Sequence, residues 1–350
     1  MNFYLKDVLT QPQELKRALQ YYHTDEVISV LEKIAEVKPQ KVIFSGMGSS
    51  HFCAVAPSIF LRNQGINSEV ISAGQLLYYE KAIVKEDTLL VLISQSGESA
   101  EIVRIIESLP EHITVVAITN QAGSTLERRG DYNLNIHVMP EKSVTTRTYL
   151  GSAVLAQLIA EVICGNNLKK VLQTMENLTE VMNSYLEAYG LQMEKLRKFA
   201  ENMRYLCILG RGYGLGTVEA GALFMREVLR FPTLDFDCAE FRHGPMEMVQ
   251  SDFYGVVLAP SGVTQKLNIG MAADICEKGG NVILITDTAG DVERIKEMEN
   301  IHIIQFPVVE EWLAPFLEIL PIQLLANTMA EEKKIPVGEF RWGSKIMRIE

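Results

Sequence analysis

The sequence predicts an α/β protein built from two duplicated, doubly wound domains, each a flavodoxin-like parallel sheet flanked by helices. Short apolar runs rich in β-branched residues alternate with longer segments of helical period, which is the pattern of βαβ units. The apolar runs are continuous, as expected of strands that are buried on both faces. The whole pattern occurs twice, at an offset of roughly 165 residues. That distance is far above solenoid periods and indicates a duplicated domain.

Five pairs of segments carry the repeat, and they follow one another in the same order in both halves. The pairs are Val42–Ser50 with Leu206–Gly214, Leu89–Ser99 with Tyr254–Thr264, Val115–Gly123 with Val282–Gly290, Ile136–His137 with Ile301–His302, and Thr148–Ile163 with Pro315–Ala330. In the first pair, each apolar run leads into a Gly-x-Gly turn and then a helix-like segment. Each half should therefore contain the same succession of strands and helices.

The repeat also gives the expected domain boundaries. They are a helical N-terminal segment over residues 1–24, a first domain over 25–165, a linker helix over 166–194, a second domain over 195–330 and a C-terminal tail over 331–350. Apolar residues recur at helical spacing from Val171 to Leu186, which predicts the linker helix. Pro336 and Gly338 should end any helix that continues into the tail.

Composition and charge narrow the class of protein. The hydrophobic fraction is 47% over 350 residues, so the chain can bury a large core without disulfides. It has 33 basic and 44 acidic residues, a net charge of −11, which argues against nucleic acid or an anionic membrane as the main partner. A small anionic ligand is still compatible with this balance, because a local site can be positive.

The same survey predicts a cytoplasmic protein without cofactor or metal. Five cysteines form no CxxC pair and are expected to be reduced thiols. The N-terminus lacks the apolar core of a signal peptide, and no run of 18 apolar residues predicts a membrane span. The six histidines show neither HxxxH nor HExxH spacing, so we expect no metal site.

Two loops of the first half are candidates for holding a phosphate group. Gly46–Ser50 and Ser94–Ser99 each lie between an expected strand and an expected helix, where open α/β sheets bind ligands. Glycine allows close approach of the backbone, and a helix N-terminus offers free N–H groups to an anion. The expected phosphate-binding residues are Gly48, Ser49, Ser50, Ser94, Gln95, Ser96 and Ser99.

Two other interpretations of these loops stay open. Serine is a favoured helix cap, so the hydroxyls could serve the backbone alone. A dinucleotide site is the other alternative, but the first loop lacks a third glycine at the fingerprint spacing. Gly210–Gly214 in the second half is closer to that fingerprint, and its likeness to the first-half loop explains it without a nucleotide.

The loop sequences SGMGSS and SQSGES, together with the duplicated layout, resemble the SIS (sugar isomerase) family. The segment GALFMREVLRFPTLDFDCAEFRHGPMEMV resembles the isomerase half of glucosamine-6-phosphate synthase. AEFRHGPMEMV with EEWLAPFLEILP most resembles the fructosamine-6-phosphate deglycases. The resemblance covers about residues 25–350. It implies a phosphosugar substrate and a homodimer with shared active sites.

The resemblance also assigns catalytic roles. Glu227 and His243 match the family's proton-transfer residues at the same spacing of 16, and a carboxylate with an imidazole suits proton transfer in open-chain sugars. Lys345 matches the lysine of the family's closing tail, which reaches the sugar. Val144 and Thr146 fall in a ligand-lining segment. Taken without the resemblance, Glu227 and His243 would more often be a solvated glutamate and a structural histidine, and Lys345 could be a surface lysine.

Two departures from the synthase favour a deglycase. The chain begins Met1-Asn2, so we expect no glutaminase domain, and Phe224 stands where the synthase has a lysine three residues before the glutamate. An aromatic ring cannot form an imine with a sugar carbonyl. We therefore expect an enzyme that cleaves a ketosamine 6-phosphate into a hexose 6-phosphate and an amine. The alternatives are an amino-sugar-phosphate isomerase or deaminase and a sugar-phosphate sensor without catalysis.

Overall fold

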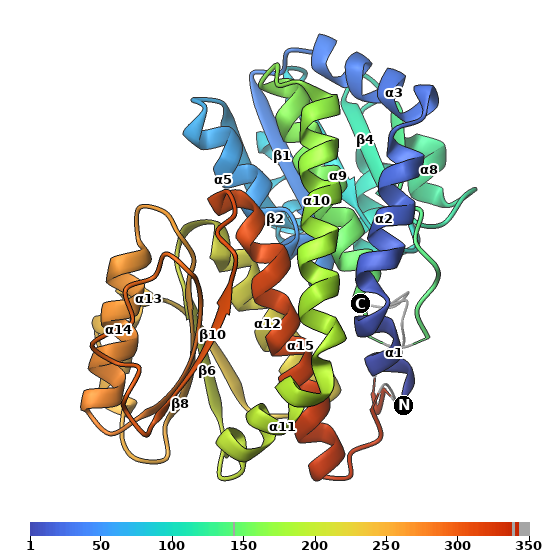
Figure 1. The fold of residues 1–350 in the computed structure, drawn as a ribbon. Coiled ribbons are helices and arrows are strands. Elements are labelled where there is room, and N and C mark those ends of the chain that lie inside the picture. Colours follow the sequence, from blue (N-terminus) through green and yellow to red (C-terminus); the bar gives the residue numbers. More distant parts are fainter. Residues whose placement is uncertain (143, 338–339, 343–350) are drawn as a thin grey trace. The chain divides into compact units, whose positions relative to one another are not determined.

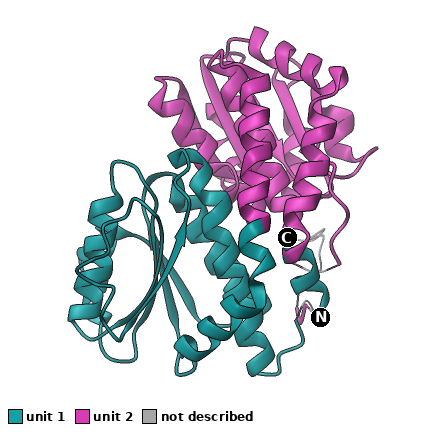
Figure 2. Ribbon diagram, viewed as in Figure 1, with its two compact units in different colours: residues 1–8, 184–339 teal, residues 9–183, 340–350 magenta. Residues whose placement is uncertain are grey.

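The computed structural model describes residues 1–142, 144–337 and 340–342. It contains two five-stranded parallel sheets (Figure 1). The chain divides into two compact units. Unit 1 comprises Met1–Val8 with Ser184–Glu339, and unit 2 comprises Leu9–Asn183 with Phe340–Glu350 (Figure 2). The predicted fold class, two duplicated doubly wound domains, is confirmed by these sheets.

The sheet of unit 2 has the strand order β2-β1-β3-β4-β5, and every neighbouring pair is parallel. Its strands are β1 (Lys41–Gly46), β2 (Asn67–Ser72), β3 (Thr88–Ile93), β4 (Thr114–Thr119) and β5 (Tyr132–Asn135). Because the chain turns to opposite sides of β1 for β2 and β3, the topological switch lies between β1 and β3. Ligands of such sheets bind where the strands end at that switch.

Helices cover both faces of this sheet. They are α2 (Gln11–Tyr22), α3 (Asp25–Glu36), α4 (Ser49–Phe52), α5 (Val55–Asn63), α6 (Ala73–Gln75), α7 (Ala100–Ser108), α8 (Thr125–Arg129), α9 (Arg147–Ile163) and α10 (Leu168–Glu187), with short η1 (Leu76–Glu80) and η2 (Lys81–Ile83). On one face, Ile43 and Leu90 of the strands pack with Ile102 of α7. The almost entirely buried α9 packs against α3 and α5. Strand β3 is buried along its whole length, which explains its continuous apolar sequence.

Unit 1 repeats the topology, with the order β10-β9-β8-β6-β7. Its strands are β6 (Leu206–Gly210), β7 (Thr233–Asp237), β8 (Tyr254–Ala259), β9 (Asn281–Asp287) and β10 (Ile301–Phe306). Its helices are α1 (Phe3–Leu9), α11 (Tyr189–Ala200), α12 (Leu215–Val228), α13 (Cys238–Arg242), α14 (Gln265–Glu277) and α15 (Ala314–Glu332), with short η3 (Gly212–Gly214), η4 (Pro245–Met248) and η5 (Glu311–Leu313). Helices α13 and α14 share a core cluster with one face of this sheet.

The most apolar helix of the chain is a core helix. Among the described residues, Glu311–Glu332 has the length and hydropathy needed to cross a membrane, but the apolar window is entirely buried within the protein. Helix α15 packs against α12 and α11. The N-terminus is fixed to the same helix, because the Tyr4 hydroxyl donates to the Gln323 carbonyl at 3.4 Å and the Asn2 amide donates to Asn327 at 2.8 Å.

The segment predicted as a linker helix is occupied by α10 and the beginning of α11. Helix α10 begins in unit 2 and ends in unit 1. The chain interrupts its helix at Ala188, two residues before Gly190, and α11 then continues to Ala200. The predicted helical N-terminal segment over residues 1–24 contains α1 and α2.

Candidate functional site

The loop between β1 and α4 depends on two glycines. Gly48 has φ +52° and ψ −125°, a conformation that side chains disfavour. A Cβ on Gly46 would lie 2.8 Å from the Ser50 backbone. The turn places Ser49 and Ser50 at the start of α4, where the His51 N–H donates to the Gly48 carbonyl at 2.9 Å. The loop expected from the sequence is therefore found at the end of β1, next to the topological switch.

The second loop, between β3 and α7, is organised by its own hydroxyl groups. The Ser94 Oγ accepts from the Gly97 N–H at 3.1 Å and lies 3.2 Å from the Ser99 Oγ. The Ser96 Oγ accepts from the Glu98 N–H at 3.2 Å. Ser99 is the N-cap of α7, but its side chain caps no backbone N–H. The positive end of the α7 dipole therefore faces a loop that is rich in hydroxyl groups, an arrangement suited to an anion.

Neighbouring elements fix the shape of this second loop. Gly97 has φ +64°, and a Cβ there would lie 2.2 Å from the Ser124 Oγ. The Glu98 carboxylate accepts from the Thr125 N–H at 2.7 Å and from its hydroxyl at 3.1 Å, which joins the loop to the start of α8. The Gln95 carbonyl accepts from the Asn120 N–H at 3.0 Å. All four predicted residues of this loop thus lie in a rigid turn at the end of β3.

The segment that contains Val144 and Thr146 is folded around Glu141, a residue that the sequence did not single out. The buried Glu141 carboxylate accepts from the Thr146 N–H at 2.8 Å and from both the N–H and the hydroxyl of Thr148, at 2.9 and 2.8 Å. Val144 and the Thr146 side chain are also buried. Glu141 therefore sets the backbone of this segment, and an acidic residue just before a Thr-rich turn was the only sequence signal for it.

In unit 1, Glu227 lies near the C-terminal end of α12, one turn after the fully buried Phe224. Burial raises the pKa of the Glu227 carboxyl to about 7. Tyr4 of α1 is completely buried, and its pKa is raised by that burial and also by the nearby charge of Glu227. Helix α12 also carries Glu219, whose pKa is raised to about 7 by burial and by the charge of Asp235. Sequence reasoning found Glu227 but not Tyr4 or Glu219.

His243 lies in the same unit, directly after α13, and its side chain is exposed. The backbone N–H of His243 donates to the Glu240 carbonyl at 3.0 Å. Asp237 caps α13 by accepting from the Ala239 N–H at 2.6 Å. Within the described part of unit 1, no hydrogen bond or ion pair connects His243 to Glu227. Glu227 is therefore partly buried and His243 is exposed, although the sequence analysis assigned both residues to proton transfer.

Two further residues of the sequence prediction lie beyond what the structure describes. Lys345 falls in the undescribed segment 343–350, and the residue before Val144 of the ligand-lining segment, Ser143, is also undescribed. In the ranges that are described, no group of three or more His, Cys, Asp or Glu side chains is arranged to hold a metal ion. The described residues therefore provide two separate sets of groups. The set in unit 2 is suited to an anion, and the set in unit 1 contains a carboxyl of raised pKa.

Comparison with known proteins finds a family match for part of the chain. Residues 34–160 match the model of the SIS domain family. The C-terminal domain of glucosamine-fructose-6-phosphate aminotransferase from Francisella tularensis has the same fold, with a TM-score of 0.86 and 20% identity over 97% of this chain and 98% of that one. Glucosamine-6-phosphate deaminase from Thermotoga maritima gives a TM-score of 0.79 at 20% identity over 99% of both chains.

More particularly, the chain is homologous to part of the glutamine–fructose-6-phosphate aminotransferases. It is 29% identical to the isomerizing enzyme of Pyrococcus horikoshii in an alignment of 338 residues that covers 94% of this chain and 54% of that protein. The corresponding protein of Thermococcus kodakarensis is 28% identical, with 94% of this chain and 55% of that protein covered. The chain thus spans about half the length of the curated relatives it matches.

Proposed function

We propose that the protein is an enzyme that moves protons between neighbouring carbon atoms of a phosphorylated, open-chain sugar. The observation that carries the proposal is Glu227, a partly buried carboxyl whose pKa lies near 7. A group with such a pKa both takes and returns a proton at neutral pH, as a general acid–base catalyst must. The Ser94–Ser99 and Gly46–Ser50 loops are assigned to the phosphate group. The relatives named as isomerizing aminotransferases support this class of chemistry.

Within this class, the proposed substrate is a ketosamine 6-phosphate, which carries an amine on C1 and a carbonyl at C2. Glu227 removes a proton from C1, the electron pair forms the C1–C2 double bond, and the C2 oxygen gains a proton. Return of a proton to C2 shifts the double bond to C1 and nitrogen. Water adds to this imine, the C–N bond breaks, and an amine and an aldose 6-phosphate leave. One water is consumed, and the chain needs no oxidant or reductant.

Phe224 supports cleavage of an amine over the synthase reaction. In the glucosamine-6-phosphate synthases that the sequence resembles, a lysine stands at this place, and Phe224 is fully buried in α12. A benzyl side chain offers neither a proton nor an amine to a sugar carbonyl. The second candidate is an amino-sugar-phosphate isomerase or deaminase, favoured by the fold shared with the Thermotoga maritima deaminase. A phosphosugar sensor without catalysis would not require the raised pKa of Glu227.

We also propose a homodimer in which His243 acts at the site of the neighbouring copy, assisting ring opening or proton delivery, and in which Lys345 contacts the sugar. The exposure of His243 at the end of α13 supports a role toward a second copy. Mixing inactive Glu227→Gln chains with inactive His243→Ala chains should restore part of the activity, because one site of each mixed dimer is then intact. No recovery after subunit exchange would indicate that Glu227 and His243 of the same chain act together at one site.

The function is tested by product analysis on three kinds of substrate: ketosamine 6-phosphates, glucosamine 6-phosphate and fructose 6-phosphate. We expect a free amine and a hexose 6-phosphate from the first kind, and a loss of about 10²- to 10⁴-fold in kcat for Glu227→Gln. Glu219→Gln is the matched control, because it neutralises a second glutamate of raised pKa on the same helix. Ammonia or an isomer from the simple sugars would assign the deaminase or isomerase reaction. Binding without turnover would assign a sensor.

A further inference from the structure

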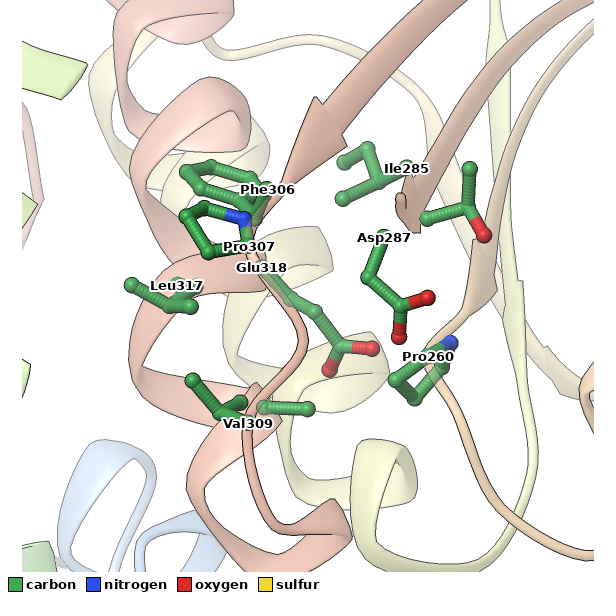
Figure 3. Close-up of a pocket in the computed structure, with 10 residues that line it drawn as sticks. Pro260, Ile285, Asp287, Phe306, Pro307, Val309, Leu317 and Glu318 are labelled. Atoms are coloured by element: carbon green, nitrogen blue, oxygen red, sulfur yellow. The ribbon is translucent and has the colours of Figure 1, made fainter. Parts of the chain in front are cut away.

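Strand β10 forms one edge of the sheet of unit 1. The strand order places β9 on one side of β10 and no strand on the other (Figure 1). Among the described elements, β9 is the one that packs extensively against β10. The strand ends at Phe306, which lines a small cavity together with Pro307 and Ile285 of β9 (Figure 3). Within the described residues, the other long side of β10 therefore has no strand beside it.

The register with β9 shows which backbone groups of β10 face that free side. The Thr288 N–H donates to the Phe306 carbonyl at 2.9 Å, in line with the parallel pairing of the two strands. Along a strand, residues whose backbone faces the partner strand alternate with residues whose backbone faces away. The even-numbered residues of β10 therefore bond to β9. The residues whose N–H and carbonyl groups face away from β9 are Ile301, Ile303 and Gln305.

A groove of about 520 Å³ lies beside these outward-facing backbone groups. It is lined by three kinds of residue: those whose backbone faces outward, His302, and part of the segment that joins β9 to β10. The lining residues are Thr288, Gly290, Asp291, Val292, Glu293, Lys296, Ile301, His302, Ile303 and Gln305. Backbone groups without a neighbouring strand, next to an open groove, are the arrangement to which an extended peptide adds as a further strand.

The side chains of β10 point to the two faces of the sheet and leave its free edge open. Ile301 and Ile303 pack against the core cluster on one face. On the other face, the ring of His302 lies 5.8 Å from the ring of Phe199. Edge strands are commonly protected by proline, lysine or a bulge. The sequence of β10 contains neither proline nor lysine, and its register with β9 is continuous.

The wall of the groove indicates the charge of the strand that would fit. Its charged side chains are Asp291, Glu293 and Lys296, and the Lys296 Nζ lies 2.6 Å from the Glu293 Oε2. The lining thus keeps a net negative charge, which Asp291 supplies. Glu297 and Glu299 follow as exposed residues of the same segment. A second copy of β10 is a poor match, because it would bring a second acidic wall and a chain of net charge −11.

We propose that the free edge of β10 binds an extended, basic peptide segment of a partner protein as an added strand. The backbone groups of Ile301, Ile303 and Gln305 supply the hydrogen bonds, and the acidic wall supplies the preference for lysine and arginine side chains. The surface belongs to unit 1 alone, and the proposal does not depend on the proposed catalytic function.

Binding of two labelled heptapeptides to the full chain, measured by fluorescence anisotropy, tests the proposal. The probes are Lys-Val-Thr-Val-Lys-Val-Lys and the same peptide with glutamate in place of lysine. We expect the basic peptide to bind, with an affinity that falls as salt is added, and the acidic peptide not to bind. Gln305→Pro should weaken binding about tenfold, because it removes one outward N–H and keeps those that donate to β9. Gln305→Ala retains this N–H and is the matched control, with unchanged affinity.

A second variant tests the acidic wall. Asp291→Lys should lower the affinity for the basic peptide by about threefold or more, since it replaces an attraction with a repulsion. Three results would overturn the proposal: equal binding of both peptides, no binding of the basic peptide at millimolar concentration, or full binding by Gln305→Pro. A change in the oligomeric state of the chain caused by Gln305→Pro would also overturn it, because the edge would then pair with a second copy.

Hydrogen exchange of the unmodified chain covers the case in which Gln305→Pro fails to fold. Without peptide, the amides of Ile303 and Gln305 should exchange faster than those of Ile304 and Phe306, which donate to β9. Saturating basic peptide should slow exchange at Ile303 and Gln305 by about tenfold or more. Unchanged exchange at these two amides while the peptide is bound would contradict an added strand.

Discussion

The carboxyl ends of the two sheets share one loop layout but carry different side chains. At the end of β3 in unit 2, hydroxyl groups of Ser94, Ser96 and Ser99 surround the turn before α7. At the end of β8 in unit 1, the matching turn is held by Asp287, with Glu318 buried close by (Figure 3). Two loops with the same layout can therefore carry different groups at the end of a strand. The turn of unit 2 presents hydroxyl groups, whereas the N–H of Ser261 in unit 1 donates to the Asp287 carboxylate.

The proposed catalytic carboxylate lies elsewhere in unit 1, on α12. Glu227 is therefore independent of the strand-end position that Asp287 occupies. We therefore propose different roles for the two units, with an anion site at a strand end of unit 2 and titratable glutamates on α12 of unit 1. The predictions below test this division of roles, beginning with the largest expected effect.

Removing hydroxyl groups from the two matched loops should have opposite consequences. The double substitution Ser94→Ala with Ser99→Ala should weaken binding of a sugar phosphate by about 10²- to 10⁴-fold, since each hydrogen bond to a charged group contributes about 1.5–3 kcal/mol. Ser261→Ala in the matching loop of unit 1 should leave the affinity unchanged. Calorimetric titration with one sugar phosphate measures both. Equal losses in the two variants would remove the distinction between the loops.

The pH dependence of kcat should report Glu227. The carboxylate acts as the base, and its pKa is about 7 in the ligand-free protein, so kcat should rise with pH through the neutral range and level off above about pH 8. Below pH 6, kcat should fall about tenfold for each pH unit. Use of kcat, measured with saturating substrate, separates this titration from the ionisation of the free substrate. A flat profile between pH 5 and 8 would show that a different group carries the proton.

The smallest expected effect concerns Glu141 in unit 2. Glu141→Gln replaces a buried acceptor of several hydrogen bonds with a group that must also donate, so we expect a loss of about 1–3 kcal/mol in the free energy of unfolding. Glu111→Gln, at an exposed position of the same unit, should change it by less than about 0.5 kcal/mol. Denaturant titration distinguishes the two variants. Equal stability of both would show that the hydrogen bonds of Glu141 are not required for this segment.

Sequence patterns predicted the fold and the two loops because both depend on local signals. Continuous apolar runs marked the buried strands, and Gly and Ser marked the turns at Gly46–Ser50 and Ser94–Ser99. Tyr4 could not be predicted in the same way, because its contact with Gln323 joins residues 319 positions apart. The burial of Glu318 could not be predicted from the sequence for a related reason. Its residue type suggests a solvent-facing helix position, and only the packing of α15 buries it.

Steady-state kinetics on a ketosamine 6-phosphate and its unphosphorylated counterpart, with and without Glu227→Gln, tests the central claim most directly. The account predicts release of amine and hexose 6-phosphate from the phosphorylated compound, a kcat/KM that is much lower without the phosphate, and loss of turnover in Glu227→Gln with binding retained. Turnover by Glu227→Gln at the rate of the unmodified protein, or equal use of both compounds, would contradict it.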